Sequence, residues 1–313
     1  MPRLSIVVFC FHDTQLLEET LVSVLQNRPD NSEVLVMHDG TYEDPYDLAD
    51  EVRFIEASAV QSMTQAANLA MQNSRGLIVH FLAGGVVPEA NWSEVALKHF
   101  DEEDIVAVVP LLLHEKDASV ACLGIRQTGL HNRALVGFGR KHLDVEGLES
   151  DGPNLVAAFY RKSQLLSLGG FREDLGDEYS DLDAGLRLQE VGDVVTAADC
   201  VLRVGRCDKP RRVSASSCGR LHHRFLTRQR ESMGAFRYHA STWLNSILEI
   251  MTAPRSPSRL LSAWSRLSAW RKQDEMAETV VEAGAIFSIE SARRQHESQE
   301  SDASVDETSR RAA

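Results

Sequence analysis

The sequence has few cysteines and no long hydrophobic run. Its 313 residues include five cysteines, with no Cys-x-x-Cys pair among them. This odd, scattered set argues against a disulfide framework or a four-thiolate zinc site and favours a reducing, cytoplasmic compartment. The longest nearly continuous apolar stretch, residues 77–87, is too short to cross a bilayer. No small-residue cleavage site follows the apolar run 4–11, so we expect a buried strand there rather than a signal peptide.

Basic residues are also scarce. Lysine and arginine total 33 against 46 acidic residues, which gives a formal net charge of −13. Such a chain lacks the basic footprint that general nucleic-acid binding needs, so no nucleic-acid partner is expected. Positive charge gathers only in residues 206–230, which hold eight lysines and arginines and a single acid, Asp208. Hydrophobic residues at 43% and charged residues at 25% are near globular averages and exclude a wholly disordered chain.

The first 113 residues alternate between strand-like and helix-like segments. Short apolar, β-branched runs predict strands at 4–9, 33–37, 52–55, 77–82 and 105–113, and helical spacing of apolar residues predicts helices at 16–25, 63–72 and 88–100. Asp13 or Thr14 can cap the first helix. This alternation predicts a mostly parallel sheet. Ligands of such sheets bind beyond the carboxyl ends of the strands, which directs attention to residues 9–13, 38–44 and 83–86.

The chain changes character in its last third. Apolar spacing predicts helices at 236–251 and 258–272. The second of these carries Trp264 and Trp270 on its apolar stripe among basic residues. It either makes a peripheral contact with a membrane, which would place the protein at the inner face of that membrane, or packs on the parent domain. We divide the chain into a domain at 1–205, a basic and helical extension at 206–289 and a disordered tail at 290–313.

Four segments resemble motifs of the family-2 glycosyltransferases with the GT-A fold. They occur in the family's order: the opening strand and helix at 4–25, the strand and turn at 33–41, the segment 81–88 and the late segment 169–188. The turn Asp39-Gly40 is similar to the family's Asp-Asp-Gly-Ser, and the late segment joins Gly-Gly-Phe to an Asp-x-Asp helix. The resemblance covers about residues 3–205. It implies an α/β fold with a GT-A-like (Rossmann-like) mixed sheet flanked by helices, followed by a helical C-terminal extension.

The resemblance also implies a reaction. A sugar would leave a UDP-, GDP- or dTDP-linked donor, with inversion, for a carbohydrate or other hydroxyl acceptor, as in polysaccharide biosynthesis. Such chemistry needs a base for the hydroxyl, positive charge on the departing diphosphate and a pocket for the nucleoside. By position, Asp181 matches the catalytic base, Asp39 the nucleoside contact, and Asp183 a neighbouring substrate-binding carboxylate. The local sequence by itself favours a helix N-cap for Asp181, and only the resemblance favours the base. Asp39 fits an ordinary Asp-Gly turn as well as it fits a nucleoside contact, so both alternatives stay open.

The main departure from the family lies at Ala83-Gly84-Gly85. Family members hold Mg²⁺ or Mn²⁺ on the diphosphate with an Asp-x-Asp motif, and Ala83 and Gly85 occupy its two aspartate positions. Neither has a side chain that can bind a hard cation, so no metal is expected here. Ala67 likewise stands where the family often has an arginine that faces the diphosphate. An uncompensated diphosphate raises the barrier by several kcal/mol, or about a thousandfold or more in rate.

The basic segment offers one form of compensation. Arg220 and Arg224 follow the catalytic-like helix and could contact a diphosphate directly, since arginine binds phosphate in a bidentate way. The other reading is a solvated or acid-paired basic face. Two functions therefore remain: a glycosyltransferase of impaired activity, or a catalytically inactive relative that keeps the scaffold as a binding or assembly module.

Overall fold

The computed structural model describes residues 2–58, 60, 62–128, 131–208, 214–229, 243–244, 246–247, 251, 260–265 and 268. The strands are β1 (Leu4–Cys10), β2 (Ser32–His38), β3 (Val52–Glu56), β4 (Ile78–Ala83), β5 (Val86–Pro88), β6 (Ile105–His114), β7 (Val120–Cys122), β8 (Ile125–Gln127), β9 (Arg133–Leu135), β10 (Ala157–Arg161) and β11 (Asp193–Val204). The α-helices are α1 (Thr14–Asn27), α2 (Met63–Asn73), α3 (Trp92–His99), α4 (Lys162–Ser167), α5 (Gly176–Leu188) and α6 (Ala215–Arg228). Two 3-10 helices, η1 (His142–Asp144) and η2 (Glu173–Leu175), complete the described elements.

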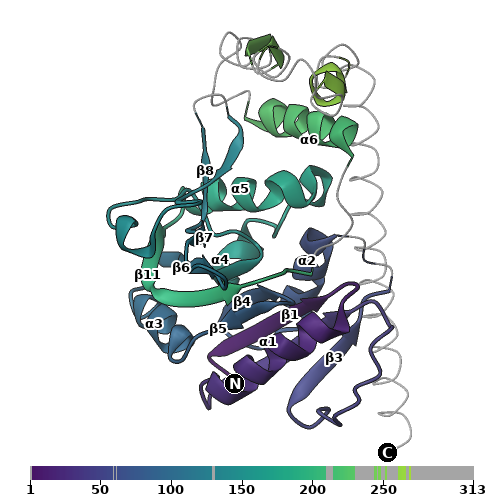
Figure 1. Cartoon of the computed structure of the whole chain (residues 1–313), viewed down its shortest axis with the longest axis vertical. Helices are drawn as coiled ribbons and strands as arrows, with labels where there is room; N and C mark the ends of the chain where they lie inside the picture. The colour runs from purple at the N-terminus through teal and green to yellow at the C-terminus, as the bar shows by residue number, and fades with distance from the viewer. Residues whose placement is uncertain are drawn as a thin grey trace, which may run out of the picture.

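A single nine-stranded mixed sheet organises the described part of the chain. Its order is β3-β2-β1-β4-β10-β6-β11-β5, with β7 paired to β6. Strands β3, β2, β1 and β4 run parallel to one another, whereas β10 is antiparallel to both β4 and β6. The expected α/β class with a mixed sheet is confirmed. Because β1, β2 and β4 are parallel neighbours, their carboxyl ends share one edge of the sheet (Figure 1).

The local predictions for the first third of the chain are confirmed, with one correction. The predicted strands correspond to β1, β2, β3, β4 and β6, and two of the predicted helices correspond to α1 and α2. Asp13 caps α1, since its side chain accepts a hydrogen bond from the Leu16 amide. The helix predicted from residue 88 begins only at Trp92, because residues 86–88 pair with β11 as the short strand β5.

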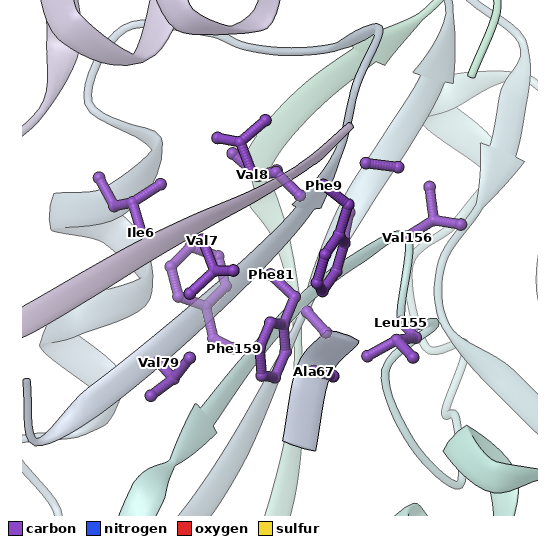
Figure 2. Packing of buried hydrophobic residues seen from close by; sticks show 14 of the residues in the cluster. Ile6, Val7, Val8, Phe9, Ala67, Val79, Phe81, Leu155, Val156 and Phe159 are labelled. Atoms are coloured by element: carbon purple, nitrogen blue, oxygen red, sulfur yellow. The ribbon is translucent and has the colours of Figure 1, made fainter. Parts of the chain in front are cut away.

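Helices cover both faces of the sheet. Side chains alternate between the two faces along a strand, so Phe81 and His80 of β4 point to opposite sides. Figure 2 shows Phe81 packed with Phe9 and with Ala67 of α2. On the other side, the His80 ring stacks on Phe159 and lies 6.3 Å from the ring of Trp92 in α3. The carboxyl ends of β1, β2 and β4 are therefore held between two buried layers.

Helix α6 belongs to the same body as α5, which it overlies in Figure 1. The ring of Tyr179 in α5 stacks on the rings of His222 and Phe225 of α6, with centroid distances of 5.4 and 5.1 Å. Part of the basic extension thus packs on the preceding domain. The predicted tail, 290–313, and Trp270 lie outside the described residues. Among those described, no helix has both the length and the apolar character that a membrane crossing demands.

Candidate functional site

The turn after β2 presents Asp39 at the carboxyl edge of the sheet. Its Oδ1 accepts hydrogen bonds from the backbone amide and the hydroxyl of Thr41, at 3.0 and 2.6 Å. Gly40 between them has φ +93°, a conformation that favours glycine. Partial burial alone would raise the pKa of Asp39, but the Thr41 hydrogen bonds, with help from His12, hold it below the usual value. Asp39 is thus an ionised, pre-oriented acceptor in an Asx turn.

The strip Ala83–Gly85 begins with the last residue of β4 and is bound to β1 and to the start of α1. The Gly84 amide donates to the Phe9 carbonyl at 3.0 Å, and the Gly85 amide donates to the Leu16 carbonyl and the Thr20 hydroxyl, both at 2.9 Å. Ala83 is fully buried. These contacts fix the position where the family's metal motif would stand.

The chain's own segment Arg206–Asp208 lies on this strip. Gly85 has φ +86°, and a Cβ built on it would lie only 2.2 Å from the Arg206 carbonyl oxygen. A Cβ on Gly84 would lie 3.4 Å from the Cβ of Asp208. The Asp208 amide also donates to the Gly84 carbonyl at 2.8 Å. The space that an Asp-x-Asp motif would need at Gly85 is therefore filled by backbone.

The carboxylate of Asp208 faces the loop between β1 and α1. Its Oδ2 accepts hydrogen bonds from three consecutive backbone amides, those of Phe11, His12 and Asp13, at 2.6, 3.1 and 3.4 Å. Successive amides at a helix start form an anion-binding concavity. Asp208 is only 5% exposed, so this carboxylate is buried in it.

Three carboxylates surround the buried Cys10 thiol at the end of β1. Burial, followed by the charges of Asp208, Asp39 and Asp13, raises the pKa of Cys10 to about 12. The thiol is therefore neutral and a poor nucleophile near neutral pH. The structure thus brings the predicted nucleoside contact, Asp39, into the same neighbourhood as the unpredicted Asp208.

This neighbourhood does not fit the family's divalent cation. Ala83 and Gly85 offer no ligand atoms on their side chains, and the side chain of Asp208 is turned to the amides of the β1–α1 loop. Across the described residues, no group of three or more His, Cys, Asp or Glu side chains is placed to hold a metal ion. The residues present at this site therefore offer no set of ligands for Mg²⁺ or Mn²⁺ among those the structure describes.

Asp181, the predicted base, is buried and paired with Arg133. The guanidinium donates from Nε to Oδ1 at 2.9 Å and from an Nη to Oδ2 at 2.7 Å. The amides of Leu155 and Leu182 donate to the same carboxylate, at 3.4 and 2.8 Å. The Asp181 side chain is 1% exposed. Both carboxylate oxygens are thus engaged, and an acceptor hydroxyl has no free lone-pair direction toward solvent.

Asp181 lies further into its helix than the sequence predicts. Asp181 was expected at the helix start, but α5 begins at Gly176, so Asp181 lies in its second turn and is not an N-cap. Burial alone would lower the pKa of Arg133, but Asp181 outweighs it and raises the pKa above its usual value. The neighbouring residues Leu155 and Val156 connect the two predicted motifs, because the Leu155 amide binds Asp181 and the Val156 carbonyl accepts from the Ala83 amide at 2.9 Å.

Asp183 lies between two guanidinium groups. Arg172 donates to Oδ1 and Arg187 to Oδ2, both at 2.8 Å, and the Asp183 side chain is 6% exposed. Arg187 also donates to the carbonyls of Leu168 and Gly170. This arrangement fastens the Gly-Gly-Phe loop to α5.

The two candidate arginines of α6 point to other partners. Arg220 is exposed and donates to the Ser217 hydroxyl at 2.8 Å. Arg224 donates to the Asp174 carbonyl in η2 at 3.0 Å. Their recorded hydrogen bonds therefore go to α6 itself and to η2 rather than to the Ala83–Gly85 strip.

Ala67 is completely buried in the core beside Phe81 (Figure 2), so an arginine at this position would have no room. Its neighbour Asn68 binds the Gly-Gly-Phe loop instead: Oδ1 accepts from the Phe171 amide and Nδ2 donates to the Phe171 carbonyl, both at 2.9 Å. Asn68 thus holds α2 against the loop that precedes α5.

Sequence reasoning missed Arg133 and Asp208. No local pattern marks Arg133, whose partner lies 48 positions away. One feature of the sequence could have identified Asp208, because it is the single acid in the basic segment 206–230. An isolated acid among eight basic residues indicates a specific partner, although the sequence does not say which.

Comparisons with known proteins agree with the motifs. Residues 5–147 match the family model described as Glycosyl transferase family 2. A solved structure of the mannosyltransferase PcManGT from Pyrobaculum calidifontis, in complex with GDP-Man and Mn²⁺, is similar with a TM-score of 0.51 and 15% identity, covering 87% of this chain and 86% of that one. A crystal structure of GalNAc-T7 with UDP, GalNAc and Mn²⁺ has a TM-score of 0.59 and 13% identity, covering 90% of this chain and 58% of that one. No curated protein matches significantly.

These identities are low, so the two structures establish the fold and nothing about this chain's ligands. The fold is that of the GT-A glycosyltransferases, and the predicted resemblance to family 2 is confirmed over residues 5–147.

Proposed function

We propose that this glycosyltransferase-like chain binds the nucleoside of a UDP-, GDP- or dTDP-linked sugar at Asp39, independently of a divalent cation, and transfers the sugar with inversion at a strongly reduced rate. The observation that carries the proposal is the segment Arg206–Asp208 lying on Ala83–Gly85, where a cation would be needed. The solved relatives hold GDP-Man or UDP together with Mn²⁺. Asp39 supports the nucleoside part, because its carboxylate is ionised and oriented by Thr41.

The transfer step would proceed by direct displacement. The acceptor oxygen attacks the anomeric carbon, its proton passes to a carboxylate, and the bond from the anomeric carbon to the diphosphate breaks with its electron pair on the leaving oxygen. Asp181 is the candidate for that proton. In the described arrangement its oxygens are held by Arg133, so Asp181 would have to exchange one of those hydrogen bonds for the hydroxyl. This exchange and the uncompensated diphosphate both lower the rate.

The Arg133–Asp181 pair also favours a second candidate function. A carboxylate that is buried and bound on both oxygens serves as a structural anchor, which fits a catalytically inactive module that keeps the scaffold to bind a nucleotide or to assemble with a partner. The two candidates differ in one respect: only the first predicts slow release of nucleoside diphosphate that depends on Asp181.

Isothermal titration calorimetry of the full chain with UDP, GDP and dTDP and their sugars, in EDTA and then in Mn²⁺, tests the proposal. We expect one nucleotide to bind with the same affinity in both buffers and Asp39→Ala to weaken it. Glu43→Ala, an exposed acid on the same loop, is the matched control. Affinity that rises tenfold with Mn²⁺ contradicts metal-independent binding. Turnover lost in Asp181→Asn while binding persists supports the enzyme, and absence of turnover in the unmodified chain supports the module.

A peripheral membrane contact through 258–272 is part of this proposal, with the protein in the cytoplasm at the inner face of a membrane. Trp264 is 72% exposed and Leu261 is 55% exposed, so two apolar side chains of this segment face solvent. Flotation with vesicles of anionic phospholipid tests it. The chain should float with the vesicles, and Trp264→Ala should reduce the floating fraction. A chain that stays in the soluble fraction contradicts the membrane contact.

A further inference from the structure

We propose that two helical pieces near the end of the described chain, at 243–251 and 260–265, insert apolar side chains into the hydrocarbon layer of an anionic membrane. The inference rests on the membrane contact of the proposed function and deepens it, because it adds the first piece and a depth of binding. A contact through basic residues alone stays at the level of the head groups, whereas insertion carries apolar side chains below them. Two observations carry it: which side chains the pieces expose, and the charge around them.

The piece 260–265 exposes its large side chains and buries its small ones. Leu260, Leu261 and Trp264 are 38, 55 and 72% exposed, and their spacing places them on one face of the helix. The residues that turn inward are Ser262, Ala263 and Ser265, all buried. A helix that packs on a domain in water buries its large apolar side chains instead. The faces of this piece are therefore the reverse of those of an ordinary amphipathic helix.

The serines of this piece bond to their own helix. The Ser265 hydroxyl donates to the Ser262 carbonyl at 2.8 Å, and the Ser268 hydroxyl donates to the Ser265 carbonyl at 2.9 Å. Hydroxyls bonded in this way are satisfied without water. Helices that meet in lipid likewise turn small residues toward each other and large apolar residues outward. The piece thus has the surface and the internal hydrogen bonds that a lipid environment favours.

The piece 243–251 repeats the pattern. Of its residues the structure describes 243, 244, 246, 247 and 251, all helical. Leu244, Ile247 and Met251 are 54, 47 and 73% exposed and recur at helical spacing, whereas Ser246 is fully buried. Figure 1 draws both pieces at the same end of the molecule as α6. Large apolar side chains that gather in this way on a surface indicate an interaction site.

The charge around the two pieces identifies the partner. Between Glu231 and Asp274 the sequence holds six basic residues and a single acid, Glu249, although the whole chain carries −13. The basic residues are Arg237, Arg255, Arg259, Arg266, Arg271 and Lys272. Anionic head groups attract such a segment, and the hydrocarbon beneath them accepts its apolar side chains. A second copy of the chain would bring the same basic segment to a two-fold contact, where like charges repel.

Flotation of the full chain with vesicles of phosphatidylcholine and phosphatidylglycerol separates insertion from charge attraction. We expect binding to persist when salt rises from about 0.1 M to about 1 M, because salt screens charges but not apolar burial. Leu261→Ser and Ile247→Ser should each lower the partition coefficient about tenfold. Leu143→Ser, at an 89% exposed position in η1, is the matched control and should float like the unmodified chain. Binding that disappears at high salt overturns insertion.

Tryptophan fluorescence measures the depth. The chain has four tryptophans, and changing Trp243→Phe and Trp270→Phe together leaves Trp264 on the surface and Trp92, which is 1% exposed, in the core. Vesicles whose lipids carry bromine on the acyl chains should quench the Trp264 emission, since bromine quenches at contact. Adding Trp264→Phe should abolish the quenching, because Trp92 stays out of reach. Bound protein that such lipids do not quench overturns the inference.

The outcomes separate this inference from the proposed function. A chain that floats only at low salt keeps the proposed membrane contact and loses insertion alone. A chain that never floats loses both, whereas nucleotide binding at Asp39 is measured by calorimetry without vesicles and is decided independently. Sedimentation without vesicles tests a second copy as the occupant. A dimer that Leu261→Ser turns into a monomer would show that the apolar surface serves self-association, and it would overturn the inference.

Discussion

Arg133 holds both carboxylate oxygens of Asp181, at 2.9 and 2.7 Å, from a two-stranded hairpin that is separate from the main sheet. The pair joins β9 to α5 across 48 positions of sequence. It places a guanidinium on both oxygens of the carboxylate that we propose as the base. The same contact thus stabilises the hairpin and restrains the candidate base.

The Arg133–Asp181 pair predicts that removing one of its charges lowers stability by more than half as much as removing both charges does. Arg133→Ala leaves the Asp181 carboxylate buried without its partner, which typically costs about 3–5 kcal/mol. Urea unfolding measures the loss. Removing both charges in Arg133→Ala with Asp181→Ala should cost less than the sum of the single changes, because each single change leaves a buried charge alone.

Arg140→Ala is the control for this pair, since Arg140 is exposed on the loop after β9 and should change the free energy of unfolding by less than about 0.5 kcal/mol. If Arg133→Ala proves as stable as Arg140→Ala, then Arg133 does not neutralise Asp181 in solution and the base is free to act.

The backbone conformation of Gly85 and its close contact with Arg206 predict that a side chain at position 85 destabilises the fold. Gly85→Ala combines a left-handed backbone with a contact of 2.2 Å to the Arg206 carbonyl, so it should cost about 2 kcal/mol or more. Gly147→Ala is the matched control, because Gly147 also has positive φ but nothing lies within 4 Å of its Cβ position. Thermal or urea unfolding of the two variants separates strain from crowding.

The motif itself can be tested in the same way. Ala83→Asp with Gly85→Asp should not gain Mn²⁺-dependent nucleotide binding in calorimetry, because the segment 206–208 occupies the space. A gain of such binding would mean that the segment yields to the new side chains at little cost.

The first third of the fold was predictable because its signals are local. Apolar runs and helical spacing identify β1, α1 and β2, and the capping role of Asp13 depends on a residue three positions away. The α5 region was less predictable. Its N-terminus is set by the turn at Gly176 and by Asp177, which binds the start of α2, 113 and 114 positions away.

The surroundings of the candidate site residues were not predictable, for the same reason. Motif spacing located Asp39, Ala83 and Asp181, but the partners that decide their chemistry come from distant parts of the chain. Arg133 lies 48 positions from Asp181, and Asp208 lies 197 positions from the Phe11 amide that it binds. Contacts at such separations depend on tertiary packing, which residue patterns within a segment do not encode.

Asp177 predicts a stability effect without a catalytic one. Its carboxylate accepts from the amides of Met63 and Thr64 and from the Thr64 hydroxyl, at 3.0, 2.8 and 2.7 Å. Asp177→Ala leaves the Met63 and Thr64 amides at the N-terminus of α2 without this acceptor, although the Thr64 hydroxyl keeps its hydrogen bond with Ser180, and should cost about 1–3 kcal/mol in urea unfolding. Glu190→Ala, an exposed acid just beyond α5, should be neutral. Equal stability of the two variants would show that water replaces Asp177 without loss.

His80 predicts how stability depends on pH. Burial lowers the pKa of His80 to about 3, against 6.5 for an ordinary histidine, and the Ala158 carbonyl offsets this only in part. Between these values the unfolded chain binds a proton that the folded chain does not, so stability is full above pH 6.5 and falls as the pH drops toward 3. The expected slope from this group is about 1.4 kcal/mol per pH unit.

Urea unfolding at pH 6.0, 5.5, 5.0 and 4.5 measures this slope. His80→Gln should lower the slope of the unfolding free energy against pH by the contribution of one proton, about 1.4 kcal/mol per pH unit. This holds whatever the substitution does to stability at pH 7. His142→Gln, at an exposed position in η1, should leave the slope unchanged. Carboxylates such as Glu33 also make stability fall as the pH drops, because the fold lowers the pKa of Glu33 although burial opposes this. Their contribution is the same in both variants and cancels in the comparison. A His80→Gln slope equal to that of the unmodified chain would mean that His80 is protonated in the folded protein, and the buried stack on Phe159 would have to open to admit the charge.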